Sequence, residues 1–359
     1  MYKIYEVKLY PNKKQELELF RILEVSRLAY NKLLEMKISA YKDDKKNLSR
    51  FDLEKVSKKM FDIPANVRSI LCHRISNAYN KFFRKQGKFP RFKSFNRMRS
   101  IGLKKYGSDG DFIFRGNKVR LWKPIGLVRF HGNLIKEEIN SGRIVKRSTG
   151  WYIQYLFEQA EKPLKKRFAK KIGIDLGLKS FLVDSEGVAI KPPKFFRESQ
   201  QKLVIAQRKL SKAVRGSNRR AGKRLLVARI HEKIANQRKD WLHKLSTSYA
   251  TRYDLVAVED LNVKGMIRNQ HLSKSISDAS WSTFVDMLAY KLKMLGRSLV
   301  KVAPHYTSQE CSRCGEMVSK SLSVRTHICN CGFVADRDYN AALNILKKAQ
   351  HGLTARTAH

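Results

Sequence analysis

Four of the five cysteines in this chain fall within 21 residues, and this cluster constrains the fold more than any other feature of the sequence. It consists of two close pairs, Cys311–Cys314 and Cys329–Cys331, which 14 residues separate. A glycine follows each pair and allows a tight turn. Two such knuckles form a tetrahedral zinc ribbon, and four protein ligands leave no open position for catalysis. We therefore expect structural zinc on Cys311, Cys314, Cys329 and Cys331.

Two details bear on this zinc site. The second pair is spaced C-x-C, tighter than the usual C-x-x-C, so His327 is an alternative ligand. The fifth cysteine, Cys72, follows Ile70 and Leu71, which predicts a buried structural thiol. The start of the chain has no signal-peptide core, and no apolar run approaches the roughly 20 residues of a membrane span. We expect a cytoplasmic protein without membrane partners, in which clustered cysteines favour metal over disulfides.

The charge of the chain indicates a polyanionic partner. Lys and Arg number 75 against 31 Asp and Glu, a formal net charge of +44. Such self-repulsion is costly unless a polyanion neutralises it, and each phosphate contact also releases counterions. A small acidic substrate cannot balance this charge, whereas a long nucleic acid can. The alternatives are a merely soluble basic surface or a membrane-binding protein, but the excess runs through the whole chain instead of one tail.

The first half of the chain predicts a small β-barrel that helices interrupt. Residues 2–9 alternate as a strand, and short alternating segments return between residues 100 and 158. Between them, residues 12–85 have helical spacing, with a break at Pro64. The apolar residues that define the first helix are Leu17, Phe20, Leu23, Leu28 and Leu33. We expect residues 1–10 and 86–162 to form the barrel and residues 11–85 to form a helical insertion.

The second half predicts an α/β domain. Two apolar strands, Lys171–Asp175 and Leu255–Glu259, each end in an acid, and a third strand covers residues 298–302. A basic helical pair covers residues 198–250, and a final helix opens at Asp336. The expected division is residues 163–302 and 333–349 for this domain, 303–332 for the zinc ribbon and 350–359 for a flexible tail.

Three carboxylates stand at the ends of these core elements: Asp175, Glu259 and Asp338. Each has an ordinary explanation as a turn or helix-cap residue, and Asp336 has the better position to cap the last helix. Together they predict a magnesium site, because phosphodiester hydrolysis benefits from two hard cations held by carboxylates, with Mn²⁺ as an alternative. We assign the neighbouring Asp184 and Asp260 to structural roles.

Several motifs, standing in a fixed order, resemble the TnpB proteins of bacterial and archaeal insertion sequences, which are relatives of the compact type V CRISPR effectors. The motifs are Gly173-Ile174-Asp175-Leu176-Gly177, Val258-Glu259-Asp260-Leu261-Asn262, Tyr306-Thr307-Ser308-Gln309-Glu310-Cys311-Ser312-Arg313-Cys314-Gly315 and Asp336-Arg337-Asp338-Tyr339-Asn340-Ala341-Ala342. The resemblance is strongest from about residue 165 to 347. It also includes Ala235–Asp240 and Ser277–Trp281, and it is weaker near the start.

The resemblance implies a fold and an activity. The fold would be a wedge-like β-barrel with a helical recognition insertion, followed by a RuvC nuclease domain of the RNase H type with an inserted zinc-ribbon target-nucleic-acid-binding module. The catalytic triad would be Asp175, Glu259 and Asp338. The activity would be cleavage of double-stranded DNA beside a short adjacent motif. One protein would bind one guide RNA from the transposon end, in a prokaryotic, nucleoid-associated setting.

The basic helical pair supplies the expected nucleic-acid contacts, with a solvated charged face as the alternative. The expected contacts, together with one arginine beside the last acid, are Lys202, Arg208, Lys209, Lys212, Arg219, Arg220, Lys223, Arg224 and Arg337. The aromatic residues Tyr79, Phe82 and Phe83 are spaced helically and are expected in the core, although stacking on bases is an alternative. The alternative functions are a nuclease-inactive RNA-guided repressor, which would have lost acids of the triad, and an accessory transposase.

Overall fold

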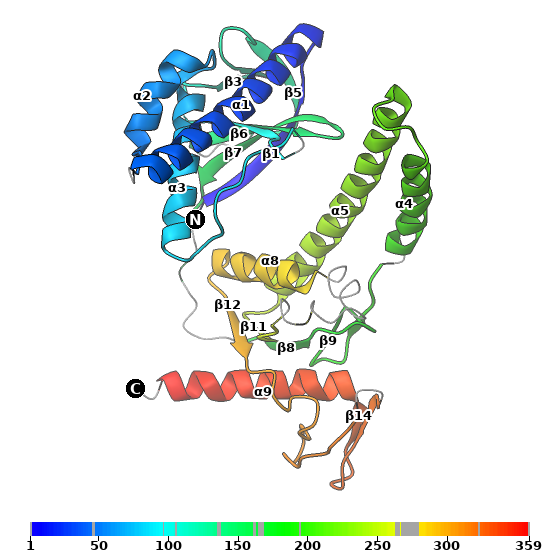
Figure 1. Cartoon of the computed structure of the whole chain (residues 1–359). Coiled ribbons are helices and arrows are strands. Elements are labelled where there is room, and N and C mark those ends of the chain that lie inside the picture. The colour runs from blue at the N-terminus through cyan, green and yellow to red at the C-terminus, as the bar shows by residue number, and fades with distance from the viewer. Residues whose placement is uncertain are drawn as a thin grey trace. The chain divides into compact units, whose positions relative to one another are not determined.

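The computed structural model describes residues 2–44, 47–95, 97–104, 106–134, 138–160, 163, 169–193, 195–262, 266, 280–321 and 324–357. The chain forms two compact units, Met1–Gln159 and Ala160–His359 (Figure 1). The finer division into domains stays a prediction. Residues 277–279 of one family-like motif lie outside the described residues. No helix in the described parts of the chain is long and apolar enough to cross a membrane.

The first unit contains a seven-stranded antiparallel sheet in the order β2-β6-β7-β1-β5-β4-β3. The strands are β1 Tyr2–Tyr10, β2 Ser100–Leu103, β3 Ile113–Arg115, β4 Lys118–Arg120, β5 Leu127–His131, β6 Ile139–Arg147 and β7 Gly150–Glu158. The N-terminal strand returns to the centre of the sheet, where β1 pairs with β7 from Tyr2↔Glu158 to Leu9↔Trp151 and with β5 on its other side. The prediction that this strand joins the later strands is therefore confirmed.

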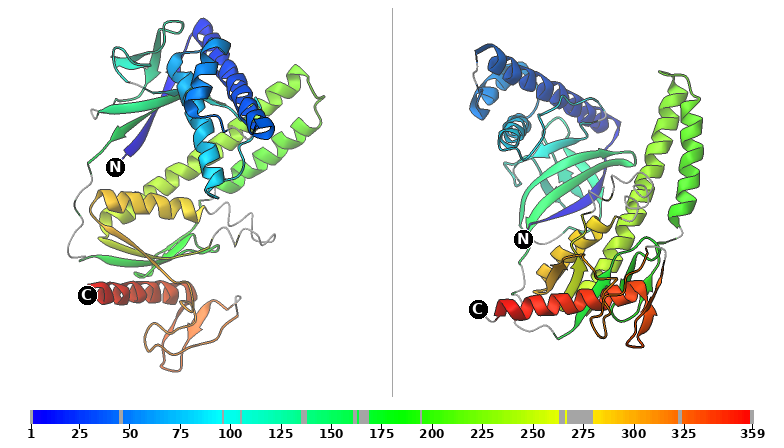
Figure 2. Two further views of the ribbon diagram at one scale, coloured as in Figure 1. Left: turned by 60° about the vertical axis from the view of Figure 1, so that its left-hand side comes forward. Right: turned by 60° about the horizontal axis from the view of Figure 1, so that its bottom comes forward.

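The sheet is curled, but it is a half-barrel rather than the expected β-barrel (Figure 2). Among the described strands, β2 and β3 are the two edges and do not pair with each other. These edge strands have only four and three residues. Closure requires strands long enough to tilt and stagger around a complete ring, and segments this short supply few hydrogen bonds for it.

Three helices cover this unit: α1 Lys13–Asp44, α2 Arg50–Met60 and α3 Ala65–Phe83. The break at Pro64 is confirmed, but a second break before α2 is not among the expectations. It follows from a capping box, in which the Asp52 amide donates to Ser49 Oγ (3.2 Å) and the Ser49 amide donates to Asp52 Oδ2 (2.8 Å). The pattern S-x-x-D therefore marks the N-terminus of α2, which the apolar spacing alone does not reveal.

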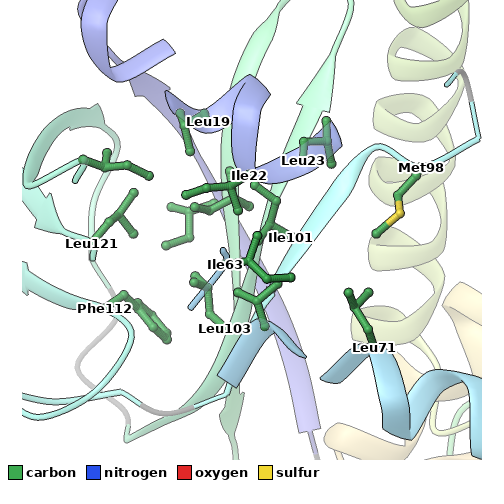
Figure 3. Packing of buried hydrophobic residues seen from close by; sticks show 14 of the residues in the cluster. Leu19, Ile22, Leu23, Ile63, Leu71, Met98, Ile101, Leu103, Phe112 and Leu121 are labelled. Atoms are coloured by element: carbon green, nitrogen blue, oxygen red, sulfur yellow. The ribbon is translucent and has the colours of Figure 1, made fainter. Parts of the chain in front are cut away.

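The apolar residues that define α1 in the sequence lie on more than one face of the helix, and only Leu23 and Leu33 among them are buried. Leu17 and Leu28 are 71% and 48% exposed, whereas Leu19, Ile22 and Leu34 are fully buried. Figure 3 shows the α1 residues Leu19, Ile22 and Leu23 packed around Ile63 of the α2–α3 connection and Ile101 of β2. The helix carries apolar residues on more than one face, so the apolar spacing is compatible with burial of either face. Contact with the sheet decides which face is buried.

The second unit contains a five-stranded mixed sheet in the order β10-β9-β8-β11-β12. Its strands are β8 Lys171–Asp175, β9 Leu182–Asp184, β10 Ala189–Ile190, β11 Leu255–Glu259 and β12 Ser298–Val302. Strand β11 runs parallel to both β8 and β12, and β9 and β10 continue the sheet as antiparallel strands. A small ribbon, β13 Thr326–Ile328 with β14 Val334–Asp336, belongs to the cysteine-rich segment.

Helices cover both faces of this sheet, as a parallel core requires (Figure 1). One face packs Val256 and Val258 against α5 Asn218–Arg252 and α8 Trp281–Met294. The other face packs Leu255 and Ala257 against α9 Arg337–Thr357. Helix α9 continues through residues 350–357, which the sequence places in a tail. Good helix formers flank Gly352 there.

Helix α9 approaches β8 so closely that only glycine fits between them. A Cβ added at Gly173 would collide with the carbonyl oxygen of Ala342 and would lie 2.8 Å from the Leu346 amide nitrogen. Both obstacles are backbone atoms of α9, so no side-chain rotation can relieve them. The identity of residue 173 therefore sets the distance between the last helix and the sheet.

Replacement of this glycine tests the packing. We expect Gly173→Ala to lower the free energy of unfolding by roughly 3 kcal/mol, the upper part of the range for overpacked cores. Urea denaturation followed by the fluorescence of Trp241 and Trp281 measures it. Gly222→Ala is the matched control, because that glycine lies inside α5 with nothing within 4 Å of the added Cβ. The control should gain about 0.5–1 kcal/mol. Equal stability of Gly173→Ala and wild type would contradict the close approach.

Candidate active site and zinc ribbon

Asp175 and Glu259 lie side by side at the carboxyl ends of two parallel strands. The register pairs Val258 with Ile174, so one step further along it Glu259 stands beside Asp175. Alternation along each strand gives both acids the same face. Asp175 shares its side of β8 with Gly173, and Glu259 shares its side of β11 with Ala257, which packs toward α9. The two carboxylates therefore project toward the last helix.

Asp338 reaches the same edge from α9. It lies four residues before Ala342, which contacts Gly173, and four helical residues rise about 6 Å. Asp175 lies two residues beyond Gly173, a strand rise of about 6.6 Å. Since this rise is close to that of the four helical residues, Asp338 reaches the level of Asp175 when the helix runs antiparallel to the strand. Consistent with this, Asp338 Oδ2 would be 3.9 Å from a Cβ at Gly177. The structure thus brings together the three acids that the sequence predicts.

The helix cap belongs to Asp336, as expected. Its Oδ1 accepts from the Asp338 amide at 2.8 Å and from the Tyr339 amide at 3.3 Å. This leaves the Asp338 carboxylate available for another partner, and Arg325 lies 3.6 Å from its Oδ1.

The environment of the acidic edge disfavours the ionised form of its carboxyl groups. The pKa of Asp175 is raised well above 3.8, first by burial and then by the charges of Glu259 and Asp338. Burial is also the largest cause of the raised pKa of Glu259, against which a hydrogen bond from Thr307 acts. The pKa of Asp338 is raised by burial and by Asp336, and Arg325 and Arg337 oppose this. Shifts of this kind at one edge are typical of functional sites.

The first part of the cysteine-rich segment is fastened to the acidic edge. Thr307 Oγ1 donates a hydrogen bond to Glu259 Oε1. Asn344 of α9 donates to the carbonyl oxygens of Thr307 (2.9 Å) and Glu310 (2.6 Å). Asn340, one turn earlier, donates to Glu310 O (2.8 Å) and accepts from the Ser312 amide (2.9 Å) within the first knuckle. Both asparagines are fully buried. Three side chains, those of Thr307, Asn340 and Asn344, therefore join the knuckle, the helix and one acid.

Thr307, Asn340 and Asn344 are residues whose roles the sequence reasoning missed. They stand inside the family-like motifs, so the motifs mark their positions. Which atoms they bond is decided by the packing of α9 against the loop that precedes the first knuckle. Buried polar side chains of this kind are retained only where their hydrogen bonds are met, and this network meets several of them.

The four cysteines converge as the ribbon prediction requires. Their sulfur atoms lie within 4.8 Å of one another, with 3.8 Å between Cys311 and Cys331 and 3.5 Å between Cys314 and Cys329. A tetrahedral zinc with Zn–S bonds of about 2.3 Å places sulfurs about 3.8 Å apart, so the donor set fits zinc. His327 is not part of this group; it is buried, and its Nδ1 contacts the Lys320 ammonium group.

Among the described residues, the cysteines are the one set of three or more His, Cys, Asp or Glu side chains whose ligand atoms are grouped tightly enough for a single ion. The three carboxylates are spaced more widely. Carboxylate oxygens are the donors that hard cations such as magnesium prefer, with water or phosphate completing the coordination. The acids therefore fit hard divalent cations by the chemistry of the donors and by their shared edge.

The two acids assigned to structural roles have them. Asp184 is buried, and its Oδ1 accepts from the Glu186 and Val188 amides, both at 3.0 Å, while Tyr249 donates to its Oδ2 at 2.6 Å. Asp260 is exposed and forms a 3.1 Å ion pair with Lys301. Neither assignment needs a metal.

Most of the expected nucleic-acid contacts lie on two antiparallel helices, α4 Phe195–Ser211 and α5, which form a projecting hairpin (Figure 2). The side chains of Lys202, Arg208, Lys212 and Arg224 are among those exposed. Arg220 differs, because its guanidinium group donates to the carbonyl oxygens of Leu210 (3.0 Å) and Ala213. It closes the turn of the hairpin, which makes it less available to phosphate. The contacts themselves stay a prediction.

The three aromatic residues singled out in α3 differ in burial. Tyr79 is buried, as expected for the core. The core prediction is wrong for Phe82 and Phe83, which are 37% and 50% exposed. They occupy the last turn of α3, where the helix extends past the body that it packs against, so helical spacing no longer implies burial.

Three family models match the chain. A model described as "Probable transposase" matches residues 154–270, and one described as "Cas12f1-like, TNB domain" matches residues 281–345. A model described as "Helix-turn-helix domain" matches residues 1–46, although the described residues there form strand β1 and the single helix α1.

Several curated proteins are similar over much of the chain. A Streptomyces pristinaespiralis protein, named as a candidate RNA-guided DNA endonuclease, is 33% identical over 361 residues, which cover 95% of this chain and 88% of the relative. The Escherichia coli K12 protein InsQ, named in the same way, is 30% identical and covers 78% of this chain and 73% of its own. The TnpB-like protein L79 of Acanthamoeba polyphaga mimivirus is 28% identical over 49% of this chain and 36% of its own.

Solved structures share the fold. The protein in a cryo-EM structure of a Cas12f1–sgRNA–target DNA complex aligns with a TM-score of 0.65 and 14% identity, over 96% of this chain and 98% of that one. The mini-RNA-guided endonuclease CRISPR-Cas_phi3 aligns with a TM-score of 0.53 and 9% identity, over 97% and 92%. At these identities the likeness concerns the fold alone.

The raised pKa of Asp175 predicts a pH dependence of stability. A carboxyl whose pKa is raised by folding binds its proton more tightly in the folded chain. The protonated Asp175 therefore adds to the free energy of unfolding. This contribution is complete below pH 3.8, the ordinary pKa, and is lost as the pH rises through the raised pKa. Without added magnesium, Asp175→Asn should therefore become more stable than wild type as the pH rises. Urea denaturation across a pH series measures this. The exposed Asp260→Asn is the control, and a wild-type profile parallel to that of Asp175→Asn would contradict the prediction.

The cysteine geometry predicts one zinc ion per chain, measurable by elemental analysis of the purified protein. Cys314→Ser should lose the ion and loosen the ribbon, because structural zinc contributes folding free energy of about 10–16 kcal/mol in small zinc domains. Cys72→Ala and His327→Gln should keep it. Loss of zinc from His327→Gln would instead assign the histidine as a ligand.

Proposed function

This chain belongs to the TnpB family of RNA-guided DNA endonucleases, and from that premise we propose that it is an RNA-guided DNA endonuclease of the IS605 type. It cleaves double-stranded DNA next to a short adjacent motif by metal-dependent phosphodiester hydrolysis. One observation carries the proposal: Asp175, Glu259 and Asp338 meet at one edge and on one face of the sheet in the second unit. An inactive relative would be expected to lack part of this set.

The three carboxylates would hold magnesium, with manganese as an alternative. When bound, the metal activates water and stabilises the leaving oxygen of the phosphodiester. The chain's own residues prepare the site for it. Burial raises the pKa of each acid, and the charges of Glu259 and Asp338 raise that of Asp175 further, so a divalent cation relieves an unfavourable cluster of charge. Thr307 orients Glu259 through its hydrogen bond, and Arg337, whose charge acts on Asp338, would offset the charge of a phosphate.

The zinc ribbon supports this site. Its first knuckle is joined to α9 through Asn340, and α9 carries Asp338. Structural zinc on the four cysteines would keep the knuckle rigid and, through it, the approach of nucleic acid to the acidic edge. The proposed division gives the ribbon residues 303–332 within a RuvC-like nuclease domain.

The partners follow from the charge and from the family. Sequence reading falls to a guide RNA from the transposon end, which pairs with the target strand, while the protein holds the heteroduplex by its backbone and shape. One chain binds one guide. The exposed Lys and Arg of α4 and α5 provide phosphate contacts, and each neutralised phosphate adds to the salt dependence of binding.

The test uses the chain co-expressed with RNA from its transposon end, with the guide redirected to a plasmid that carries randomised flanking sequence. Wild type should cut in magnesium and show a flanking preference. Asp175→Ala should lower the cleavage rate by roughly a thousandfold, about 4 kcal/mol of transition-state stabilisation. Asp260→Ala, next to Glu259 but exposed, is the matched control and should cut normally.

Other outcomes of this experiment have definite meanings. Tight guided binding without cutting by wild type would identify a repressor. Cutting that does not require RNA, or cutting that survives Asp175→Ala, would overturn the proposed function.

A further inference from the structure

A long acid-free stretch crosses the end of α3 and the chain that follows it. No Asp or Glu occurs between Asp62 and Asp109. The basic residues in its central part are Lys81, Arg84, Lys85, Lys88, Arg91, Lys93, Arg97 and Arg99. The phenylalanines interleaved with them are Phe82, Phe83, Phe89, Phe92 and Phe95. The proposed catalytic site uses none of these residues.

The structure gathers several of these rings into one exposed group. Phe82 lies 5.6 Å from Phe83 and 5.2 Å from Phe89 between ring centroids. The buried Tyr79 lies beneath them, 6.1 Å from Phe83 and 5.5 Å from Phe89. Phe82, Phe83 and Phe89, here called the aromatic cluster, are 37%, 50% and 44% exposed. Phe92 and Phe95 follow on the same chain and are 52% and 65% exposed.

The chain carrying this cluster is held in place. Asn31 of α1 bonds both backbone groups of Lys93, accepting from its amide at 2.7 Å and donating to its carbonyl at 2.9 Å. Arg27 donates to the same carbonyl at 3.2 Å. A surface pinned in this way loses little conformational entropy when it binds a partner.

The turn after α3 has a feature that its basic side chain can explain. The Gln86 amide bonds to Lys81 O (2.8 Å) and the Lys85 amide bonds to Phe82 O (2.9 Å), which together form a Schellman ending. This ending places Lys85 in the left-handed region, with φ of 57°. Glycine is the usual residue there, because a Cβ is unfavourable in that conformation. Lys85 keeps a positive charge beside the aromatic cluster in spite of this cost.

Exposed aromatic rings among lysines and arginines fit one chemical class of partner. Contiguous exposed apolar surface marks interaction sites, and the absence of acids requires the partner to be anionic. A paired duplex offers phosphates but keeps its base faces stacked, so rings on the protein would gain little. Unpaired nucleotides offer both phosphates and open base faces for stacking.

We propose that the aromatic cluster and the basic residues around it bind an unpaired segment of the guide RNA by base stacking and phosphate contacts. This inference rests on the proposed function and deepens it. The guide is favoured over target DNA because it is the resident partner. The exposed phenylalanines and the net charge of +44 favour a polyanionic partner that is already bound before the protein encounters target DNA. Sequence-tolerant stacking also suits a structural segment of the guide more than its base-pairing part.

Tryptophan fluorescence tests the stacking directly. In full-length Phe83→Trp, a single-stranded oligouridylate at about 0.15 M salt should quench the new indole, because a base stacks on it. Phe51→Trp is the matched control: Phe51 is 70% exposed in the same unit and has an arginine 4.8 Å from its ring, but acidic residues surround it in sequence. Its fluorescence should not change. Equal quenching of both variants by the oligouridylate would overturn the proposal, and so would an unquenched Phe83→Trp that still binds it. Quenching of Phe83→Trp by an RNA duplex to the same extent, or more strongly by oligothymidylate, would also overturn it.

Lys85 provides a second test that separates folding from binding. Lys85→Gly should raise the melting temperature, since glycine relieves the left-handed position. It should also lower the slope of log affinity against log salt for the oligouridylate by about 0.7, the contribution of one phosphate contact to a single strand. Lys85→Arg should keep the slope. An unchanged slope in Lys85→Gly would overturn the role of Lys85.

Failure of this inference is distinguishable from failure of the proposed function. Guided cleavage by wild type, together with an unquenched Phe83→Trp, would overturn the surface assignment and leave the nuclease in place. A wild type that binds no RNA would overturn both.

Discussion

The close approach of α9 to β8 at Gly173 is the contact on which the second unit depends. Because no Cβ separates the helix backbone from the strand, one turn of helix lies directly over two residues of strand. Asp338, one turn before Ala342, is thereby brought to the level of Asp175, and strand pairing adds Glu259 beside it. A larger residue at position 173 would move the helix outward and carry Asp338 away from the other acids. The candidate site is in this sense a consequence of core packing.

Such a cluster of acids has an energetic cost, and the surrounding network keeps it in place. Burial raises the pKa of all three carboxyls, and neighbouring acids raise those of Asp175 and Asp338 further. Thr307 holds Glu259, Asn344 holds the loop that carries Thr307, and Asn340 holds the first zinc knuckle. The zinc ribbon therefore acts on the acidic edge through hydrogen bonds to α9, without supplying a ligand to it. We expect divalent cations to stabilise the arrangement, because they would neutralise the charge that folding concentrates.

The remainder of the chain shows the opposite imbalance, an excess of basic over acidic residues. In the second unit this excess lies on the hairpin of α4 and α5, and in the first unit it surrounds the aromatic cluster at the end of α3. The hairpin offers charge with few exposed rings, which suits the regular backbone of a duplex. The aromatic cluster offers rings as well as charge, which suits unpaired bases. Two basic surfaces of different chemistry match an RNA that is partly paired and partly unpaired.

The sequence by itself determined the elements that carry the chemistry: strands ending at Asp175 and Glu259, the cap at Asp336, and two cysteine knuckles that meet in space as predicted. Period, capping and ligand spacing are local properties, and residues near one another in the chain specify them. Only the tertiary structure decided that α1 buries Leu19 and not Leu17, that the sheet stays an open half-barrel, that Phe82 and Phe83 are exposed, and that Arg220 closes a turn. It also decided that Thr307 bonds Glu259. These outcomes depend on which distant segment lies against each side chain, and a local pattern contains no information about that contact.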